Sequence, residues 1–263
     1  MTAIVGWHNR VFSGVAMPDL KRIHETANAI IGLLESEALK RVEVSADSEA
    51  ARMSACLTMS IFEQFHAAMA LVEAGLASHA AGPIRSMLDG LGDLMNLAKD
   101  QSYLDSMKLD TACENGGLFR EFMKSPSIDE SMREELTRWV DHDKPIIDEL
   151  TGRKVKRYDM RQKLRNVGVE PIYVSYKLLC AHVHPNVTTL GSRHGNHSDQ
   201  LVYRGPLPRD AEIMLHTLAV DYLVRCVSEI PKFSKGITVE EIDALTNKAV
   251  GMWREVVPAP EGE

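Results

Sequence analysis

Hydrophobic residues recur along most of the chain at intervals of three and four positions, the spacing of one face of an α-helix. Segment 19–42 carries such a stripe, made of Leu20, Ile23, Ala27, Ile30, Ile31 and Leu34. Segment 45–75 repeats the pattern with Met53, Leu57, Ile61, Phe65, Ala68 and Val72. The chain has no strand-like alternation of useful length. The pattern therefore predicts an all-α fold.

Capping and breaking residues divide this pattern into separate helices. Asp19 after Pro18 suits the start of the first helix, and Gly75 suits the end of the second. A third helix begins near Ala80 or is kinked there, because Pro83 fits an early helical turn better than a helix interior. Further helices are expected at about 102–124, 127–150, the later part of 153–165, 170–184, 209–230 and 238–256.

Residues 185–208 are rich in Asn, Gly, Pro and His and predict a long irregular loop, with room for a short strand at 200–205. Loops of this length inside a compact domain usually serve a function. No Gly/Ser/Pro linker divides the chain. We therefore expect a single-domain helical bundle of about seven to nine helices over 1–257, followed by a flexible tail at 258–263.

Composition narrows the class of protein. The chain has 263 residues, 44% of them hydrophobic and 25% charged, as in an ordinary globular protein. Its net charge of −7 argues against a nucleic-acid protein that works by charge alone. No apolar run of about 18 residues and no signal peptide are evident, so we expect a cytoplasmic protein with no membrane partner. The four cysteines lack a Cys-x-x-Cys pair and are expected to be reduced, buried thiols.

His184 is the first candidate for chemistry. Pro185 follows it, and the residue before a proline is pushed out of the helical conformation, so the predicted helix 170–184 should end at His184. A helix C-terminus favours imidazolium, which suits a general acid or base. The alternative is a helix-capping histidine without chemistry.

Three other histidines lie close to His184 in sequence. His182 is two positions earlier and faces another side of the helix. His194 and His197 fall in the predicted loop, where they could join His184 and a carboxylate around zinc or another transition metal. Their spacing matches no known motif, so a metal site is the less favoured alternative and no cofactor is expected.

Arg85 and Asp89 are four residues apart on a helical face that also carries Ile84, Leu88 and Leu91. This face points partly inward, so the arginine needs a partner, and Asp89 is the obvious one. The pair is either a structural ion pair or a phosphate-binding arginine held by a carboxylate.

Segment 153–165 reverses the sign of the chain's charge. It carries seven basic residues, opposed within the segment only by Asp159: Arg153, Lys154, Lys156, Arg157, Arg161, Lys163 and Arg165. Tyr158 adds a stacking surface. The segment is either a solvated face or a binding site for a phosphate-bearing partner such as RNA or a nucleotide.

Two motifs resemble those of an uncharacterised group of bacterial helical proteins, over roughly residues 50–200. The first is Arg-Ser-x-x-acid, matched here by Arg85, Ser86 and Asp89. The second is Tyr-x-x-Leu-Ser-x-x-x-His-Pro, matched by Tyr176, Leu179, Cys180, His184 and Pro185, with Cys where Ser is commoner.

The layout also resembles, more distantly, the HEPN superfamily. These are all-α proteins, often dimeric, of toxin–antitoxin and phage-defence systems, and many are metal-independent ribonucleases. The resemblance implies a histidine that takes the proton from the ribose 2′-hydroxyl and an arginine that stabilises the phosphate. The superfamily's usual arginine, four to six residues before the histidine on one helix, is absent around His184. Arg85, from a different helix, would take its place.

Three functions therefore remain open. The first is a metal-independent ribonuclease with Arg85, Asp89 and His184 at its centre, and it requires Arg85 and His184 to converge in space. The second is a non-catalytic module that binds nucleic acid, a nucleotide or a protein through the basic segment, with Tyr158 and Tyr176 as stacking or binding residues. The third is a metal-dependent hydrolase using His184, His194 and His197. A homodimer is expected, because the long apolar helices carry more hydrophobic surface than a small bundle needs.

Overall fold

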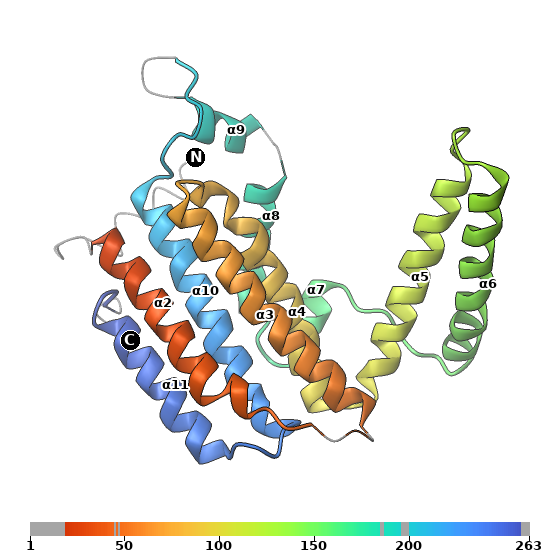
Figure 1. Cartoon of the computed structure of the whole chain (residues 1–263), viewed down its shortest axis with the longest axis horizontal. Helices are drawn as coiled ribbons and strands as arrows, with labels where there is room; N and C mark the ends of the chain where they lie inside the picture. Colours follow the sequence, from red (N-terminus) through yellow and green to blue (C-terminus); the bar gives the residue numbers. More distant parts are fainter. Residues whose placement is uncertain (1–18, 45, 47, 185–186, 196–199, 259–263) are drawn as a thin grey trace. The chain divides into compact units, whose positions relative to one another are not determined.

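The computed structural model describes residues 19–44, 46, 48–184, 187–195 and 200–258 (Figure 1). These residues form ten α-helices and four short 3-10 helices, and their one strand-like feature is an isolated bridge between Gly195 and Leu201. The predicted all-α fold is confirmed. Chain contacts group the residues into two compact units, one containing residues up to Met95 and from Pro171 onward, the other Asn96–Glu170. The single domain over 1–257 stays a prediction, and 259–263 of the expected tail lie outside the described residues.

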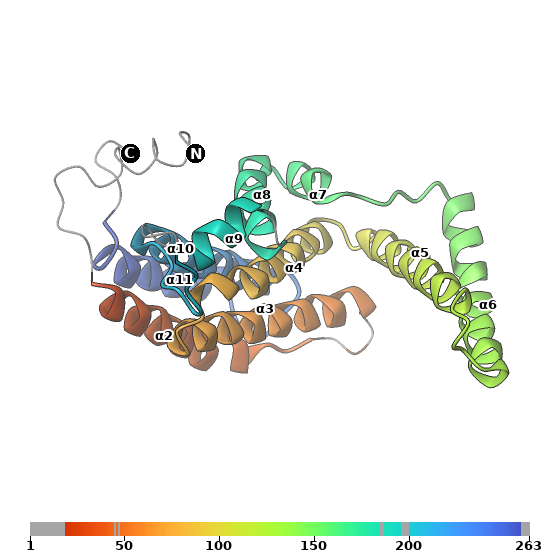
Figure 2. The ribbon, with the colours of Figure 1, turned by 90° about the horizontal axis from the view of Figure 1, so that it is seen from above.

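The first unit is built around α10 (Arg209–Glu229), which packs against α2 (Leu20–Glu37), α3 (Glu49–Glu73) and α11 (Val239–Arg254). Figures 1 and 2 show these helices side by side, with α4 (Ala81–Lys99) next to α3. A Cβ atom at Gly90 of α4 would lie 3.4 Å from the side chain of Ile61 on α3. The small residues of α4 thus allow α3 and α4 to approach closely.

Local sequence signals begin and end these helices as expected. The Asp19 side chain accepts a hydrogen bond from the Lys21 backbone at the start of α2, and Ser48 caps α3 in the same way through Ala51. Gly75 follows α3 with a φ of +71°, a conformation that only glycine adopts at no steric cost. The predicted stripe of α2 is buried from Ile23 to Leu34. The core of the unit therefore follows from the hydrophobic spacing.

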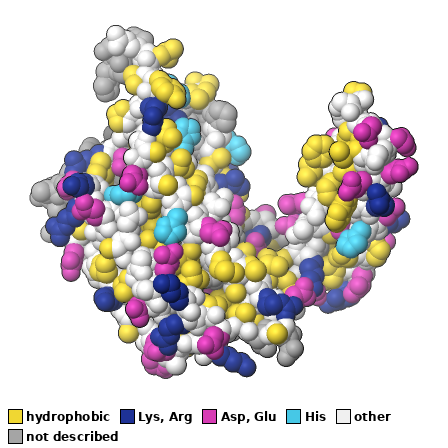
Figure 3. All heavy atoms as spheres, in the orientation of Figure 1, with side chains coloured by type: hydrophobic (Ala, Val, Ile, Leu, Met, Phe, Trp, Pro, Cys, Tyr) yellow, Lys and Arg dark blue, Asp and Glu magenta, His cyan; other side chains and the backbone are white. Residues whose placement is uncertain are grey.

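The second unit contains α5 (Tyr103–Met123), α6 (Glu130–Gly152) and α7 (Met160–Asn166). α5 and α6 form a helical hairpin and pack along each other. Of the residues of α6, only Asp143 and Leu150 are buried. Hydrophobic side chains gather near the loop end of the hairpin (Figure 3), where four of them are about half exposed: Leu118, Phe122, Met132 and Trp139. The hairpin thus leaves an apolar face in contact with solvent.

The region 185–208 differs from the predicted long loop, because it contains an eight-residue helix, α9 (Val187–His194). α9 has no apolar stripe to reveal it. It is stabilised instead by polar contacts with the preceding helix α8 (Tyr173–Val183): the Thr189 hydroxyl donates a 2.7 Å hydrogen bond to the Ala181 carbonyl, and the Arg193 guanidinium reaches the His182 carbonyl. This helix brings the number of described α-helices to ten. The short strand suggested at 200–205 is reduced to the single bridge.

The four cysteines differ in their exposure to solvent. All four cysteines are free thiols, but only Cys226 is fully buried and Cys56 is exposed, so the expectation that all are buried was wrong. Burial raises the pKa of the Cys226 thiol to about 12.

α3 has the length and hydropathy of a membrane-spanning helix. Buried core helices of globular proteins meet the same two criteria, and the buried residues of α3 belong to the core of the first unit.

A chain of hydrogen bonds crosses from α2 to α10 inside the first unit. The His216 Nδ1–H donates to the Glu212 carbonyl at 2.9 Å, so its Nε2 accepts from the His24 Nδ1–H at 3.3 Å, and His24 Nε2 accepts from the Asn28 amide at 3.0 Å. Burial is the main cause that lowers the pKa of the fully buried His216.

We expect acid to destabilise the protein through His216. Its folded pKa lies below the unfolded value of about 6.5, so the unfolded chain binds the extra proton and stability falls as the pH drops below that value. Melting temperatures between about pH 8 and 5.5 should decline for the wild type and decline less for His216→Asn. His142→Gln, at an exposed histidine of α6, should keep the wild-type slope. Equal slopes in all three proteins would contradict this role for His216.

The expected homodimer stays a prediction, and the exposed apolar face of the hairpin is the surface through which we expect it to form. Light scattering of the 29.3 kDa chain at micromolar concentration should give about twice that mass. Phe122→Glu should reduce the mass to that of a monomer, whereas Met59→Glu, an equally apolar exposed position on α3, should not. A wild-type mass near 29.3 kDa would be evidence against the dimer.

Candidate functional site

Arg85 of α4 lies against Tyr176 of α8, so the two helices are neighbours, as predicted. Arg85 Nη2 donates a 3.0 Å hydrogen bond to the Tyr176 hydroxyl, and the guanidinium carbon lies 5.2 Å from the centre of the tyrosine ring. The predicted ion pair is also present, with 3.7 Å between Arg85 Nη2 and Asp89 Oδ2. Tyr173 stacks on Tyr176 at 5.7 Å between ring centres. The arginine is therefore held by both a carboxylate and an aromatic residue.

The electrostatics of this group keep Arg85 charged and Tyr176 neutral. The hydrogen bond to Tyr176 is the main cause that raises the pKa of Arg85, with a further contribution from Asp89. Desolvation is the main cause that raises the pKa of the Tyr176 hydroxyl. The buried Nε of Arg85 has no hydrogen-bond partner among the described residues. A guanidinium and a phenol hydroxyl placed in this way can together bind a phosphate oxygen.

The α8 residues of the second motif follow one face of that helix, because Tyr176, Cys180 and His184 are each four positions apart. α8 ends as predicted: His184 is its C-cap, with extended backbone (ψ 129°), and its N–H bonds to the Cys180 carbonyl at 3.0 Å. Its side chain is exposed. Tyr176 and His184 are about 12 Å apart along the helix axis. Arg85, which contacts Tyr176, and His184 therefore lie toward opposite ends of this stripe of α8 side chains.

His182 lies in a different environment from His184. Its side chain is half-buried, and its pKa is lowered first by burial and then by the nearby charge of Arg193. Arg193 donates hydrogen bonds to the carbonyls of both His182 and Ser78. The predicted separation of His182 from His184 around the helix agrees with this difference in exposure.

The histidine set proposed for a metal is only partly within the described residues. His194 donates from Nδ1 to the Val202 carbonyl at 3.1 Å, whereas His197 lies outside the described residues. Among the residues that the structure describes, no group of three or more His, Cys, Asp or Glu side chains is placed to hold a metal ion. The metal alternative stays a prediction without support from these side chains.

The arginines of the basic segment are paired with carboxylates, two of which lie far from it in sequence. Arg153 bonds to Asp105 and Glu149. Arg157 Nε donates to Asp110 at 2.5 Å. Arg161 and Arg165 share Glu170, at 2.7 and 2.8 Å. These two guanidinium groups lower the pKa of the Glu170 carboxyl to about 2.

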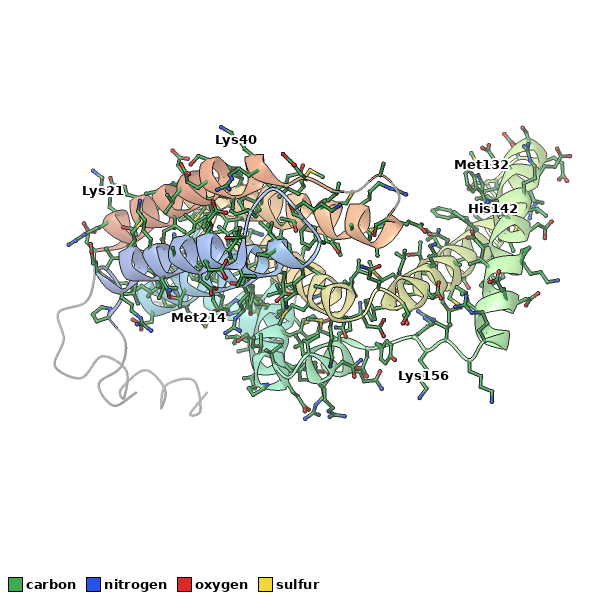
Figure 4. All side chains as sticks on the ribbon, turned by 90° about the horizontal axis from the view of Figure 1, so that it is seen from below. Lys21, Lys40, Met132, His142, Lys156 and Met214 are labelled. Atoms are coloured by element: carbon green, nitrogen blue, oxygen red, sulfur yellow. The ribbon has the colours of Figure 1, made fainter. Side chains whose placement is uncertain are left out.

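These ion pairs reduce the positive charge that the segment presents to a binding partner. Exposed pairs add little stability, but they cancel the positive field that a nucleic acid would meet. Tyr158 is likewise engaged, stacked on Tyr103 at 6.0 Å. Lys154 and Lys156 remain exposed on the connection between α6 and α7, and Figure 4 shows Lys156 directed away from the helices. RNA or nucleotide binding by this segment stays a prediction with a weaker electrostatic basis.

Arg193 was missed by the sequence reasoning. It lies in α9, where no apolar spacing marks a helix, so no signal placed it near Ser78 and His182. Tyr203 and Arg204 were also missed, because the segment after α9 has no motif.

Comparison with known proteins gives one match. The model of a family of unknown function, DUF5677, matches residues 52–201, which include Arg85, Asp89, Tyr176 and His184. No curated protein and no solved structure matches the chain. Since the family model covers more than half of the sequence, the chain belongs to DUF5677, a family of unknown function.

Proposed function

We propose that the protein is a HEPN-like ribonuclease that cleaves RNA phosphodiesters without a metal ion, as an effector of a toxin or phage-defence system. The observation that carries the proposal is the Arg85–Tyr176 pair on the same face of α8 as the exposed His184. A fixed cation can hold the phosphate backbone of an RNA, and an accessible imidazole at a helix end can accept a proton.

His184 and Arg85 have different roles in the proposed reaction. His184 takes the proton from the ribose 2′-hydroxyl, whose oxygen attacks the adjacent phosphorus, and the 5′-oxygen leaves and is protonated by solvent. Because Arg85 and His184 lie toward opposite ends of the stripe, Arg85 holds a neighbouring phosphate and not the reacting one. Arg85 is thus a substrate-binding residue, and Asp89 and Tyr176 position its guanidinium.

A second function is favoured by the same geometry. Arg85 with Tyr176 can bind a phosphate whether or not His184 performs chemistry, as in a non-catalytic RNA- or nucleotide-binding module. The neutralised arginines of the basic segment make the α8 face, and not that segment, the better binding surface.

Replacement of His184 separates the two functions. We expect His184→Ala to abolish cleavage of single-stranded RNA and to leave the melting temperature nearly unchanged, because the side chain is exposed. His182→Ala should retain cleavage and lower the melting temperature, since His182 is half-buried. EDTA should leave cleavage unaffected. Loss of cleavage in EDTA would instead support the metal alternative, and RNA binding without cleavage by the wild type would support the binding module.

Replacement of Arg85 tests its role in binding. We expect Arg85→Lys and Tyr176→Phe to raise KM for RNA, by about tenfold for the loss of a charged hydrogen bond, with a smaller change in kcat. The pH profile should stay that of the wild type, because arginine is charged throughout. Arg225→Lys is a matched control, since Arg225 forms a similar ion pair with Asp221 on α10. A fall in kcat at constant KM would contradict the proposed role.

A further inference from the structure

A small cleft lies in the first unit, between the α3–α4 connection, α9 and the segment that follows α9. Its volume is about 100 Å³, enough for a group the size of a phosphate but not for a whole nucleotide. The lining contains two arginines, two histidines and no carboxylate: Gly75, Leu76, Ser78, His79, Arg193, His194, Tyr203, Arg204 and Gly205. The cleft therefore has a positive lining.

Arg193 is a half-buried cation with no carboxylate partner among the residues that the structure describes. Nη2 donates to the Ser78 carbonyl at 2.8 Å and also to the His182 carbonyl, and none of the described residues bonds to the buried Nε. Desolvation lowers the pKa of its guanidinium. Burial of a charge beside neutral carbonyls alone is unfavourable, and a bound anion would offset this cost.

Arg204 adds a second cation to the lining. Its guanidinium also reaches a backbone carbonyl, that of Ala74, and the described residues give it no carboxylate. Its backbone has a φ of +56°, a left-handed conformation that is unfavourable for arginine. Such backbone strain clusters at ligand-binding sites, where the surrounding structure maintains it.

The pairing of other arginines sharpens the contrast. Arg85, Arg157 and Arg225 each lie next to an aspartate. Arg193 and Arg204 instead line one cleft together with His79 and His194. A tetrahedral oxyanion matches a cleft with several N–H donors and two guanidinium groups.

We propose that this cleft binds the phosphate group of a phosphate monoester, the chemistry shared by a free nucleoside monophosphate and the 5′-phosphorylated end of an RNA. Tyr203, which is 88% exposed, lies at the lining and offers a ring on which the attached base can stack outside the cleft. The inference goes beyond the proposed ribonuclease activity, because it concerns different residues and is measured by binding without cleavage.

Calorimetric titration of the full chain at low salt tests the site. We expect inorganic phosphate and AMP to bind and adenosine not to bind, with AMP the tighter of the two because of Tyr203. Tyr203→Ala should bring AMP to the affinity of inorganic phosphate. A 5′-phosphorylated oligonucleotide that binds more tightly than AMP and than its 5′-hydroxyl counterpart identifies an RNA end as the source. An AMP that binds as tightly identifies a free nucleotide.

Variants locate the binding. Arg204→Gln and His79→Gln should each weaken phosphate binding by about tenfold, the loss of one charged or strong hydrogen bond. Arg193→Gln should weaken it further, with circular dichroism to check the fold, because Arg193 also links α8 to α9. Arg52→Gln is the matched control, since Arg52 is exposed and also bonds to a backbone carbonyl. His184→Ala should bind phosphate as the wild type does.

Two results would overturn the site: no binding of phosphate or AMP at millimolar concentration, or wild-type affinity in both Arg204→Gln and His79→Gln. A protein that binds phosphate in the cleft, as judged by the weaker binding of Arg204→Gln and His79→Gln, but cleaves no RNA would retain this inference and lose the ribonuclease. A protein that cleaves RNA but does not bind phosphate in the cleft would do the reverse.

Discussion

Burial of α10 is the constraint on which the first unit depends. This helix contacts α2, α3 and α11, and its fully buried side chains include Tyr222, Leu223 and Val227. A buried polar side chain can offset the loss of water by forming hydrogen bonds inside the protein. His216 does so through its hydrogen bonds to the Glu212 carbonyl and to His24. The same packing holds α3, and through it α4, which carries Arg85.

Arginines in different parts of the chain have different hydrogen-bond and ion-pair partners. The arginines of 153–165 face carboxylates on α5, on α6 and at Glu170, so a segment that is strongly basic in sequence is nearly neutral in the structure. Arg193 and Arg204 are surrounded by carbonyls and histidines. The anion site that we propose therefore rests on arginines with no carboxylate partner among the described residues, and not on the density of basic residues.

The two proposed sites use neighbouring elements of the first unit. α8 carries Tyr176 and His184 on one face, while its His182 carbonyl accepts a hydrogen bond from Arg193 of α9. Cys180 lies between Tyr176 and His184 on that face. A ligand phosphate bound to Arg193 would thus lie near the end of α8 that carries His184. α8 is short, at 11 residues, and it carries Tyr176 of the first proposed site while contacting Arg193 of the cleft.

The sequence by itself determined the helical fold, most helix boundaries, the end of α8 at His184 and the Arg85–Asp89 pair, because each depends on spacing or capping within a few residues. Tertiary structure decided the rest. α9 has no apolar stripe and depends on contacts to Ala181 and His182. The positive charge of the basic segment is offset by acidic residues up to 48 residues away in the sequence. Tyr176 became the partner of Arg85 across 91 residues. Such contacts are fixed by how helices pack, and no local pattern encodes them.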